Sequence, residues 1–98
     1  MDPALRCAAR VHVKDMVDND FFSHTGSNGS TAQQRAKNAG YGGLVAEDLG
    51  DGYFGAAQAV DGWKNSPAHC IHMLGNYTDV GVAHRSGTSR SWGLLMGK

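Results

Sequence analysis

The side chains best suited to chemistry in this chain are its five histidines, which run from His12 to His84. An imidazole titrates near neutral pH and can act as a general base or bind a divalent metal. Two imidazoles with one carboxylate would leave a metal position open for water, as in hydrolytic zinc sites. No local spacing such as HExxH groups histidines with an acidic residue in this chain. A zinc site, a His–Glu general base and a hydrogen-bonded structural cleft therefore remain alternatives.

The other reactive side chains have plainer interpretations. His12 lies on the apolar stripe of a predicted helix, so we expect a core histidine with one hydrogen bond. His69 and His72 are one helical turn apart and could chelate an ion, although we expect His72 to face solvent or pack on a neighbour. Arg35 is expected to pair with a carboxylate or to lie on the surface. No Gly-x-Ser-x-Gly elbow occurs, which argues against a serine hydrolase.

The two cysteines, Cys7 and Cys70, are too far apart in the sequence to form a zinc-binding pair. They are compatible with one disulfide or with two buried free thiols, and the residues alone do not decide between these. Cys70 could be a nucleophile beside His69 only in the absence of a bridge.

The bulk composition indicates one domain over residues 1–98, with nine basic and nine acidic residues and no net charge. No basic stripe is present, which argues against a nucleic-acid-binding protein. The apolar stretches are too short for a transmembrane segment. Asp2 and Arg6 interrupt any apolar N-terminal run, so an exported protein would carry its signal peptide upstream of this sequence.

Local signals predict helices first and strands last. Asp2-Pro3 begins a helix that should end near Val17, and Ser30 with Gln33 forms a capping box for a second helix that ends at Gly40. Further helices are expected over residues 55–65 and after Ser66-Pro67. Alternating residues predict strands around residues 80–82 and 92–96, joined by a turn at 86–89, with an extra strand near 44–49. This order favours an α+β layered domain.

Several segments, in this order, resemble the bacterial branch of the CAP superfamily, the SCP/PR-1-like secreted domains. Ala46-Glu47-Asp48-Leu49 is similar to the family's Gly-Glu-Asn-Ile, and the segment from Trp63 to His69 is similar to its Trp-x-x-Ser-Pro-Gly-His. The resemblance covers about residues 4–97, and the matching segments are residues 7–12 with 15–16, 19–25, 29–31 with 34–36, 39–41, 46–49, 60–69 and 77–82.

The resemblance implies a compact α–β–α sandwich with a small antiparallel sheet, and an exported protein. It also implies a cleft lined by His24, Glu47 and His69. The second acid of plant and animal members falls near Asn65 or Ser66, and neither is acidic. The family domain begins with a further helix before Asp2. Its absence here predicts an N-terminally shortened sandwich with one flank uncovered, or closed by a second copy in a homodimer.

The resemblance further implies a Cys7–Cys70 disulfide and hence an oxidising compartment. The resulting hypothesis is a secreted CAP-type domain whose polar cleft binds a small ligand, which is a lipid, a peptide or a cell-wall fragment. No cofactor is required, and zinc is the candidate metal for His24, Glu47 and His69. The alternatives are a peptide or ester hydrolase that uses the same three residues for catalysis, and an interaction or stability module with an inert cleft.

Overall fold

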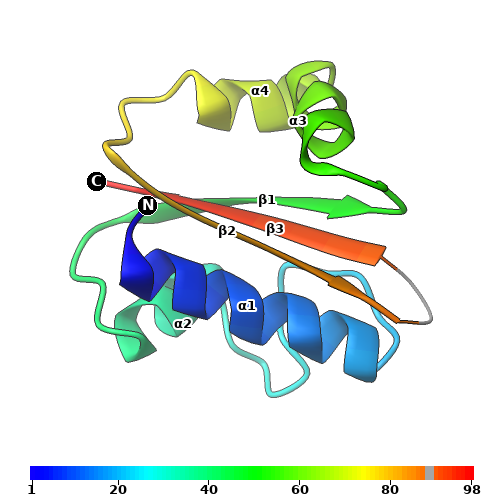
Figure 1. Cartoon of the computed structure of the whole chain (residues 1–98). Coiled ribbons are helices and arrows are strands. Elements are labelled where there is room, and N and C mark those ends of the chain that lie inside the picture. The colour runs from blue at the N-terminus through cyan, green and yellow to red at the C-terminus, as the bar shows by residue number, and fades with distance from the viewer. Residues whose placement is uncertain (88–89) are drawn as a thin grey trace.

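The computed structural model describes residues 1–87 and 90–98 (Figure 1). Its elements are α1 (Pro3–Asp18), α2 (Ala32–Asn38), β1 (Val45–Asp51), α3 (Ala56–Lys64), α4 (Pro67–Met73), β2 (Asp79–Ser86) and β3 (Arg90–Gly97). The predicted α+β order is confirmed. Of the predicted turn at residues 86–89, Thr88 and Ser89 lie outside the described residues.

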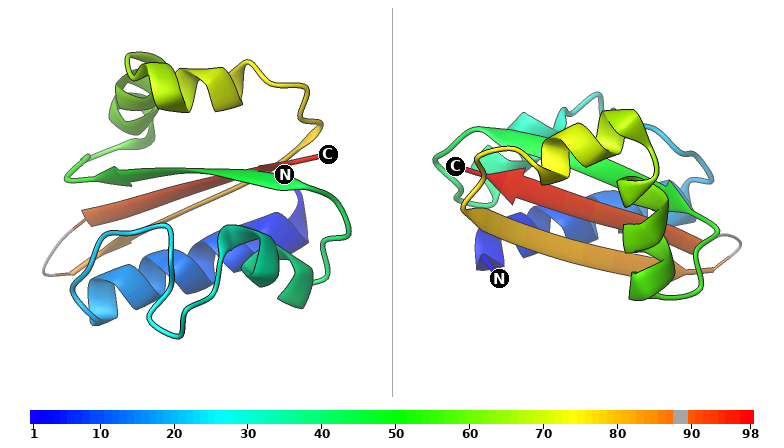
Figure 2. Two further views of the ribbon diagram at one scale, coloured as in Figure 1. Left: turned by 180° about the vertical axis from the view of Figure 1, so that it is seen from behind. Right: turned by 90° about the horizontal axis from the view of Figure 1, so that it is seen from above.

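The strands form one antiparallel sheet in the order β1-β3-β2, which places β3 at its centre. Leu95 of β3 lies opposite Glu47 on one side and Gly81 on the other. α1 and α2 cover one face of the sheet, and α3 and α4 cover the other (Figures 1 and 2). The predicted α–β–α sandwich is therefore confirmed.

α1 forms where the sequence places it because both its start and its buried stripe are local properties. Asp2 caps the helix by accepting a 3.0 Å hydrogen bond from the Leu5 amide, and Pro3 occupies the first turn. Leu5 and Met16 are completely buried, and they pack with Leu95 of the sheet in the main core. This packing fixes the end of α1 from which the chain continues to His24.

α2 begins one residue later than predicted. The capping box consists of Thr31 and Gln34, whose reciprocal hydrogen bonds measure 3.1 and 2.9 Å. Ser30 is not the cap because its carbonyl oxygen accepts hydrogen bonds from Gly26 and from the Arg35 side chain. The helix ends before Gly40, whose φ of 102° favours glycine.

The second face of the sheet has a smaller core built on the two tryptophans. Trp63 of α3 is 2 % exposed, and its indole donates a 2.8 Å hydrogen bond to the Leu49 carbonyl of β1. The Trp92 indole donates to the Tyr53 carbonyl, also at 2.8 Å. α4 contributes no fully buried residue, so it is the more exposed helix of this layer.

The predicted Cys7–Cys70 disulfide is not formed, and both thiols are free. Cys7 belongs to α1 and Cys70 to α4, and these helices lie on opposite faces of the sheet (Figure 1). A disulfide requires Cα atoms within about 7 Å of each other. The intervening sheet therefore prevents the pairing within one chain.

Among the described helices, none has both the length and the apolar character that a membrane crossing requires.

Candidate functional site

The site is organised by β1, which is an edge strand of the sheet. Successive side chains of a strand point to opposite faces. Glu47 therefore faces the α1–α2 layer, where it contacts Arg35, and Asp48 faces the α3–α4 layer, where it contacts His72. Two neighbouring carboxylates thus serve two separate imidazole-containing networks.

Glu47 is buried, and both of its carboxylate oxygens have partners. Oε1 accepts a 2.9 Å hydrogen bond from Nδ1 of His24, and Oε2 accepts a 2.9 Å bond from Nη2 of Arg35. The Glu47 and Arg35 side chains are only 4 % and 5 % exposed, so the pair is shielded from solvent. Such a buried, hydrogen-bonded ion pair fixes the carboxylate in one orientation.

Arg35 also ties the loop around His24 to α2. Its Nη2 donates to the His24 carbonyl at 2.9 Å, and its Nη1 donates to the Ser30 carbonyl at 2.8 Å. The guanidinium therefore contacts both the backbone of His24 and the carboxylate that holds the His24 ring. The prediction that Arg35 pairs with a carboxylate is confirmed.

His24 presents its ring to solvent, because its side chain is 64 % exposed. A carboxylate paired with a guanidinium can only accept hydrogen bonds, so Nδ1 of His24 carries the proton that points at Glu47. Nε2 is left at the free edge of the ring. It offers a lone pair when the ring is neutral and an N–H group when the ring is charged.

His12 is the predicted core histidine, and it contacts the loop that carries His24. It is 1 % exposed, and its Nε2 lies 2.6 Å from the Ser23 carbonyl oxygen. Burial lowers the pKa of His12 below its usual 6.5, which outweighs the nearby Glu47 and the Ser23 bond, both of which raise it. The neutral ring donates from Nε2 and so holds the residue next to His24 in place.

The sequence did not point to the second network, between Asp48 and His72. Asp48 is completely buried, and its Oδ1 lies 2.8 Å from Nδ1 of His72, whose side chain is 37 % exposed. Oδ2 of Asp48 has no hydrogen-bond partner among the described residues. The only sequence signals were the aspartate at the family's asparagine position and a histidine one turn after His69.

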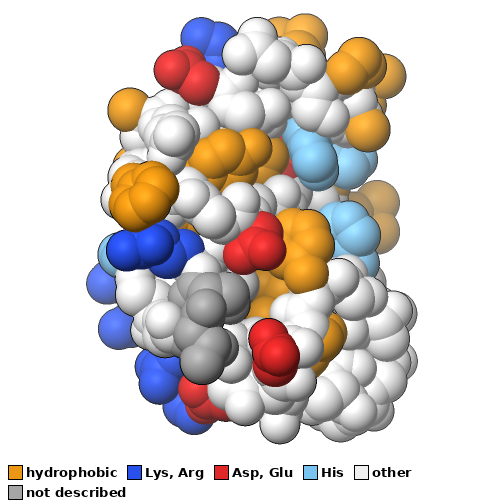
Figure 3. Space-filling model, turned by 90° about the vertical axis from the view of Figure 1, so that its right-hand side faces the viewer, with side chains coloured by type: hydrophobic (Ala, Val, Ile, Leu, Met, Phe, Trp, Pro, Cys, Tyr) orange, Lys and Arg blue, Asp and Glu red, His pale blue; other side chains and the backbone are white. Residues whose placement is uncertain are grey.

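The predicted set of His24, Glu47 and His69 is joined only in part. His69 is half-buried on α4 and has no hydrogen bond to His24 or Glu47 in the described part of the chain. Figure 3 shows histidine side chains in two neighbouring places on the right-hand side of the view, and a further one at its left edge.

The residues present do not fit the predicted zinc ion. Within residues 1–87 and 90–98, no three histidine, cysteine, aspartate or glutamate side chains are grouped so that they could hold a metal. Arg35 already occupies the second oxygen of Glu47 and places a positive charge there. A cation at that oxygen would have to displace the guanidinium, so zinc binding is not supported, and the side chains that Glu47 joins are those of His24 and Arg35.

Comparisons with known proteins agree with this architecture. The family model described as CAP, the cysteine-rich secretory protein family, matches residues 1–94. An outer surface protein of Borrelia burgdorferi superposes with a TM-score of 0.88 at 25% identity, covering 99% of this chain and 74% of the other. An extracellular protein of Bacillus anthracis that contains an SCP domain gives a TM-score of 0.92 at 26% identity, with 99% and 32% covered.

No curated protein matches the sequence. The family match nevertheless spans nearly the whole chain, and the two bacterial structures share its complete sandwich. The chain belongs to the CAP, or cysteine-rich secretory protein, family.

Proposed function

We propose that this chain is an exported ligand-binding domain in which the exposed His24 imidazole contacts the ligand, while Glu47 and Arg35 position it. The observation that carries the proposal is the continuous hydrogen-bonded path from Arg35 through Glu47 to His24. The path ends at a ring that is 64 % exposed. In ligand-binding sites, the side chain that contacts the ligand is typically held in one orientation by buried neighbours, as the ion pair holds this imidazole.

The free Nε2 of His24 favours a ligand that is rich in hydroxyl and amide N–H groups. A neutral imidazole accepts one hydrogen bond at this atom, and sugar hydroxyls and peptide amides supply such donors. Among the ligands that the family resemblance implies, a cell-wall fragment carries both groups. The location fits, because both structural relatives are described as surface or extracellular proteins of bacteria.

Hydrolysis is the weaker alternative for the same residues. A His–Glu pair can act as a general base. In the described part of the chain, however, no serine, threonine or cysteine side chain is hydrogen-bonded to His24, and the Ser23 hydroxyl accepts from the Thr25 amide. Arg35 is also paired with the Glu47 carboxylate. Glu47 therefore stabilises a positively charged His24 ring less than an unpaired carboxylate would.

Binding can be tested by following the histidine ring signals in NMR spectra while a soluble disaccharide–peptide cell-wall fragment is added. We expect saturable shifts at His24, and a His24→Ala variant should weaken binding by about tenfold, the factor for loss of one well-positioned hydrogen bond. The matched control is His84→Ala, because His84 is also exposed but stacks on Trp92 of β3.

Palmitate and an unrelated peptide are parallel probes of the other ligand classes. Equal affinity of His24→Ala and the parent protein for the cell-wall fragment would refute the proposal. Release of products from the fragment, lost in His24→Ala, would replace binding by hydrolysis. Absence of any shift with all three probes would favour the inert interaction module.

A further inference from the structure

The outer edge of β2 is open, in contrast to that of β1. Both are edge strands, because the order of the sheet is β1-β3-β2. Residues 47–50 in the middle of β1 are all buried. In β2, Val80 is 39 % exposed and residues 84–86 are exposed, and Figure 2 shows the strand at the outer border of the sheet. An open edge strand presents backbone N–H and C=O groups with which another chain can pair.

The register of the sheet identifies the free backbone groups of β2. Leu44 and Lys98 exchange both backbone hydrogen bonds, each of 3.0 Å. Because these groups alternate in direction along a strand, the even-numbered residues of β3 turn theirs towards β1 and the odd-numbered ones turn theirs towards β2. The odd-numbered residues of β2 lie opposite the latter and bond with them. The N–H and C=O groups of Val82 and His84 therefore point away from the sheet.

A contact at the start of β2 confirms this orientation. The carbonyl oxygen of Val80, another even-numbered residue, accepts a 2.8 Å hydrogen bond from the Asp2 amide. The N-terminal segment thus occupies the edge at Val80. Further along, no group in the described part of the chain is bonded to the backbone of Val82 or His84 on this side. Each of these two residues offers one donor and one acceptor to an incoming strand.

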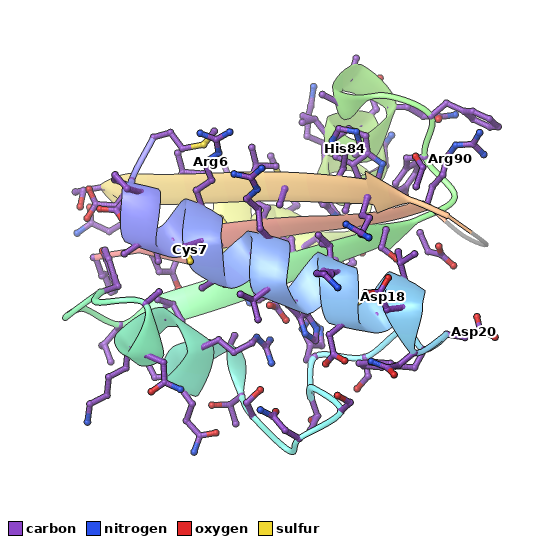
Figure 4. All side chains as sticks on the ribbon, turned by 60° about the horizontal axis from the view of Figure 1, so that its bottom comes forward. Arg6, Cys7, Asp18, Asp20, His84 and Arg90 are labelled. Atoms are coloured by element: carbon purple, nitrogen blue, oxygen red, sulfur yellow. The ribbon has the colours of Figure 1, made fainter. Side chains whose placement is uncertain are left out.

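Basic side chains line the α1 side of this edge. α1 runs beside β2, since the backbone of Arg6 lies against Gly81 and the carboxylate of Asp18 lies 3.5 Å from Nε of Arg85. Arg10 follows Arg6 by one helical turn, so it lies between these two points. Both arginines are exposed. Figure 4 shows Arg6 on the side of α1 next to β2.

The charge of Arg6 and Arg10 is not compensated by the described residues. Neither side chain takes part in an ion pair within residues 1–87 and 90–98. The acidic residues at the two ends of the edge have other partners: Asp2 caps α1, Asp79 accepts a 2.7 Å hydrogen bond from the Tyr41 hydroxyl, and Asp18 pairs with basic side chains. A partner that carries carboxylates would therefore complement this edge.

The two faces of β2 differ, which sets the side-chain pattern of a partner strand. Ala83 belongs to the core under α1, so Val82 points to the opposite face, where it is partly exposed. A partner residue opposite Val82 shares that face and is best apolar and β-branched. Its neighbours lie on the α1 face beside Arg6 and Arg10 and are best acidic.

A second copy of this chain suits the edge less well. In a two-fold pairing of β2 with itself, the α1 helices of both copies would lie beneath the junction. Arg6 and Arg10 of one copy would then face the same basic residues of the other. Such like-charge contacts disfavour association.

We propose that the open edge of β2 binds an extended acidic peptide segment as an additional antiparallel strand. Its backbone pairs with Val82 and His84, its acidic side chains face Arg6 and Arg10, and its alternate apolar side chains pack beside Val82. Recognition by strand addition obtains affinity from the backbone and specificity from alternate side chains. This surface is separate from the exposed ring of His24.

The probe is a fluorescein-labelled peptide of alternating valine and glutamate, whose binding is followed by fluorescence anisotropy. We expect saturable binding, and a lysine-for-glutamate counterpart should not bind. Arg6→Glu and Arg10→Glu should each weaken binding by about fivefold, the factor for one exposed ion pair. Lys37→Glu, the matched charge reversal at an exposed position of α2, should leave the affinity unchanged.

Backbone methylation of the peptide tests strand addition without altering the protein. In the proposed register the valines pair with Val82 and His84, so their N–H groups point towards β2, and those of the glutamates point away. N-methylation of the valines should abolish binding, whereas N-methylation of the glutamates should preserve it. Equal affinities of the two methylated peptides, or the reverse preference, would overturn the proposal.

Amide hydrogen exchange locates the bound peptide on the protein. In the free protein, Gly81 and Ala83 are bonded to β3 and should exchange slowly, whereas Val82 and His84 should exchange fast. With nine-tenths of the protein bound, exchange at Val82 and His84 should slow by about tenfold, because only the unbound fraction exchanges there. Unchanged exchange at both amides would overturn the proposal.

Protection of Val82 and His84 that rises with protein concentration, without peptide, would assign the edge to a second copy and would also overturn the proposal. None of these measurements uses His24 or a cell-wall fragment. Failure here is therefore distinguishable from failure of the proposed function.

Discussion

At the residue scale, the central feature is that one buried carboxylate serves two different donors. Glu47 receives the imidazole of His24 on one oxygen and the guanidinium of Arg35 on the other. Removal of one member of a buried ion pair leaves the other charge uncompensated, at a typical cost of about 3–5 kcal/mol. The network is therefore both a structural clamp and the support of the exposed ring, and the two roles share the same atoms.

His12 should make stability dependent on pH. Its folded pKa lies below the 6.5 of an unfolded histidine because of burial. Between these two values the unfolded chain holds more protons than the folded one. The contribution of His12 to the free energy of unfolding is thus complete above about pH 6.5 and is lost as the pH falls through its folded pKa. We expect the free energy of unfolding, measured with urea, to decrease from pH 7 to pH 5.

A His12→Gln variant isolates this contribution. Glutamine can still donate a hydrogen bond to the Ser23 carbonyl, but it does not titrate. The decrease between pH 7 and pH 5 should be smaller in this variant than in the parent protein, and His84→Gln is the control for the loss of a histidine. Identical pH profiles for His12→Gln and the parent protein would contradict the assigned burial effect.

At the scale of elements, the helices were predictable because their ends are set by neighbouring residues. Asp2-Pro3 and Gly40 are local signals, and the structure places helix ends at both. The start of α2 was wrong by one residue because Ser30 and Thr31 both have capping side chains. The choice between them depends on Arg35, which binds the Ser30 carbonyl. The local sequence pattern does not predict such a contact between a helix side chain and a loop carbonyl.

The candidate site was less predictable than the helices. The family resemblance pointed to His24 and Glu47, which do pair. The partnership of Asp48 with His72 depends on which face of β1 each residue occupies and on how α4 lies over the sheet. Both are tertiary properties, and a one-residue change in strand register would exchange the two carboxylates.

The contact between α1 and β2 depends on the absence of a side chain at Gly81. A Cβ atom there would overlap the backbone of α1 at Leu5 and Arg6, which cannot move aside as a flexible side chain can. We expect Gly81→Ala to destabilise the protein by about 1–3 kcal/mol, the usual cost of overpacking. Urea unfolding monitored by tryptophan fluorescence measures this change.

Gly42→Ala is the matched control, because nothing lies within 4 Å of a Cβ at that position. There the added methyl group mainly restricts the unfolded chain, and a small gain of about 0.4–1 kcal/mol is expected. Equal stabilities of the two variants would show that α1 is not packed closely against β2.

At the scale of the whole molecule, the three layers decide which distant residues can meet. The sheet separates α1 and α2 from α3 and α4 (Figure 2). Residues of different layers can approach each other only at the edges of the sheet. The same separation keeps Cys7 and Cys70 apart, so the oxidising compartment that was inferred from their pairing loses its support from within the chain.

Thiol counting tests this layered arrangement directly. The protein, purified without reductant and then unfolded in guanidinium, should show two reactive thiols per chain, because both cysteines are free in the fold. A Cys7→Ser variant should show one. In the native state Cys7 should react faster than Cys70, because the Cys7 thiol is exposed whereas Cys70 is partly buried. A monomer without reactive thiols would require α1 and α4 to meet on one face, which is incompatible with a sheet between them.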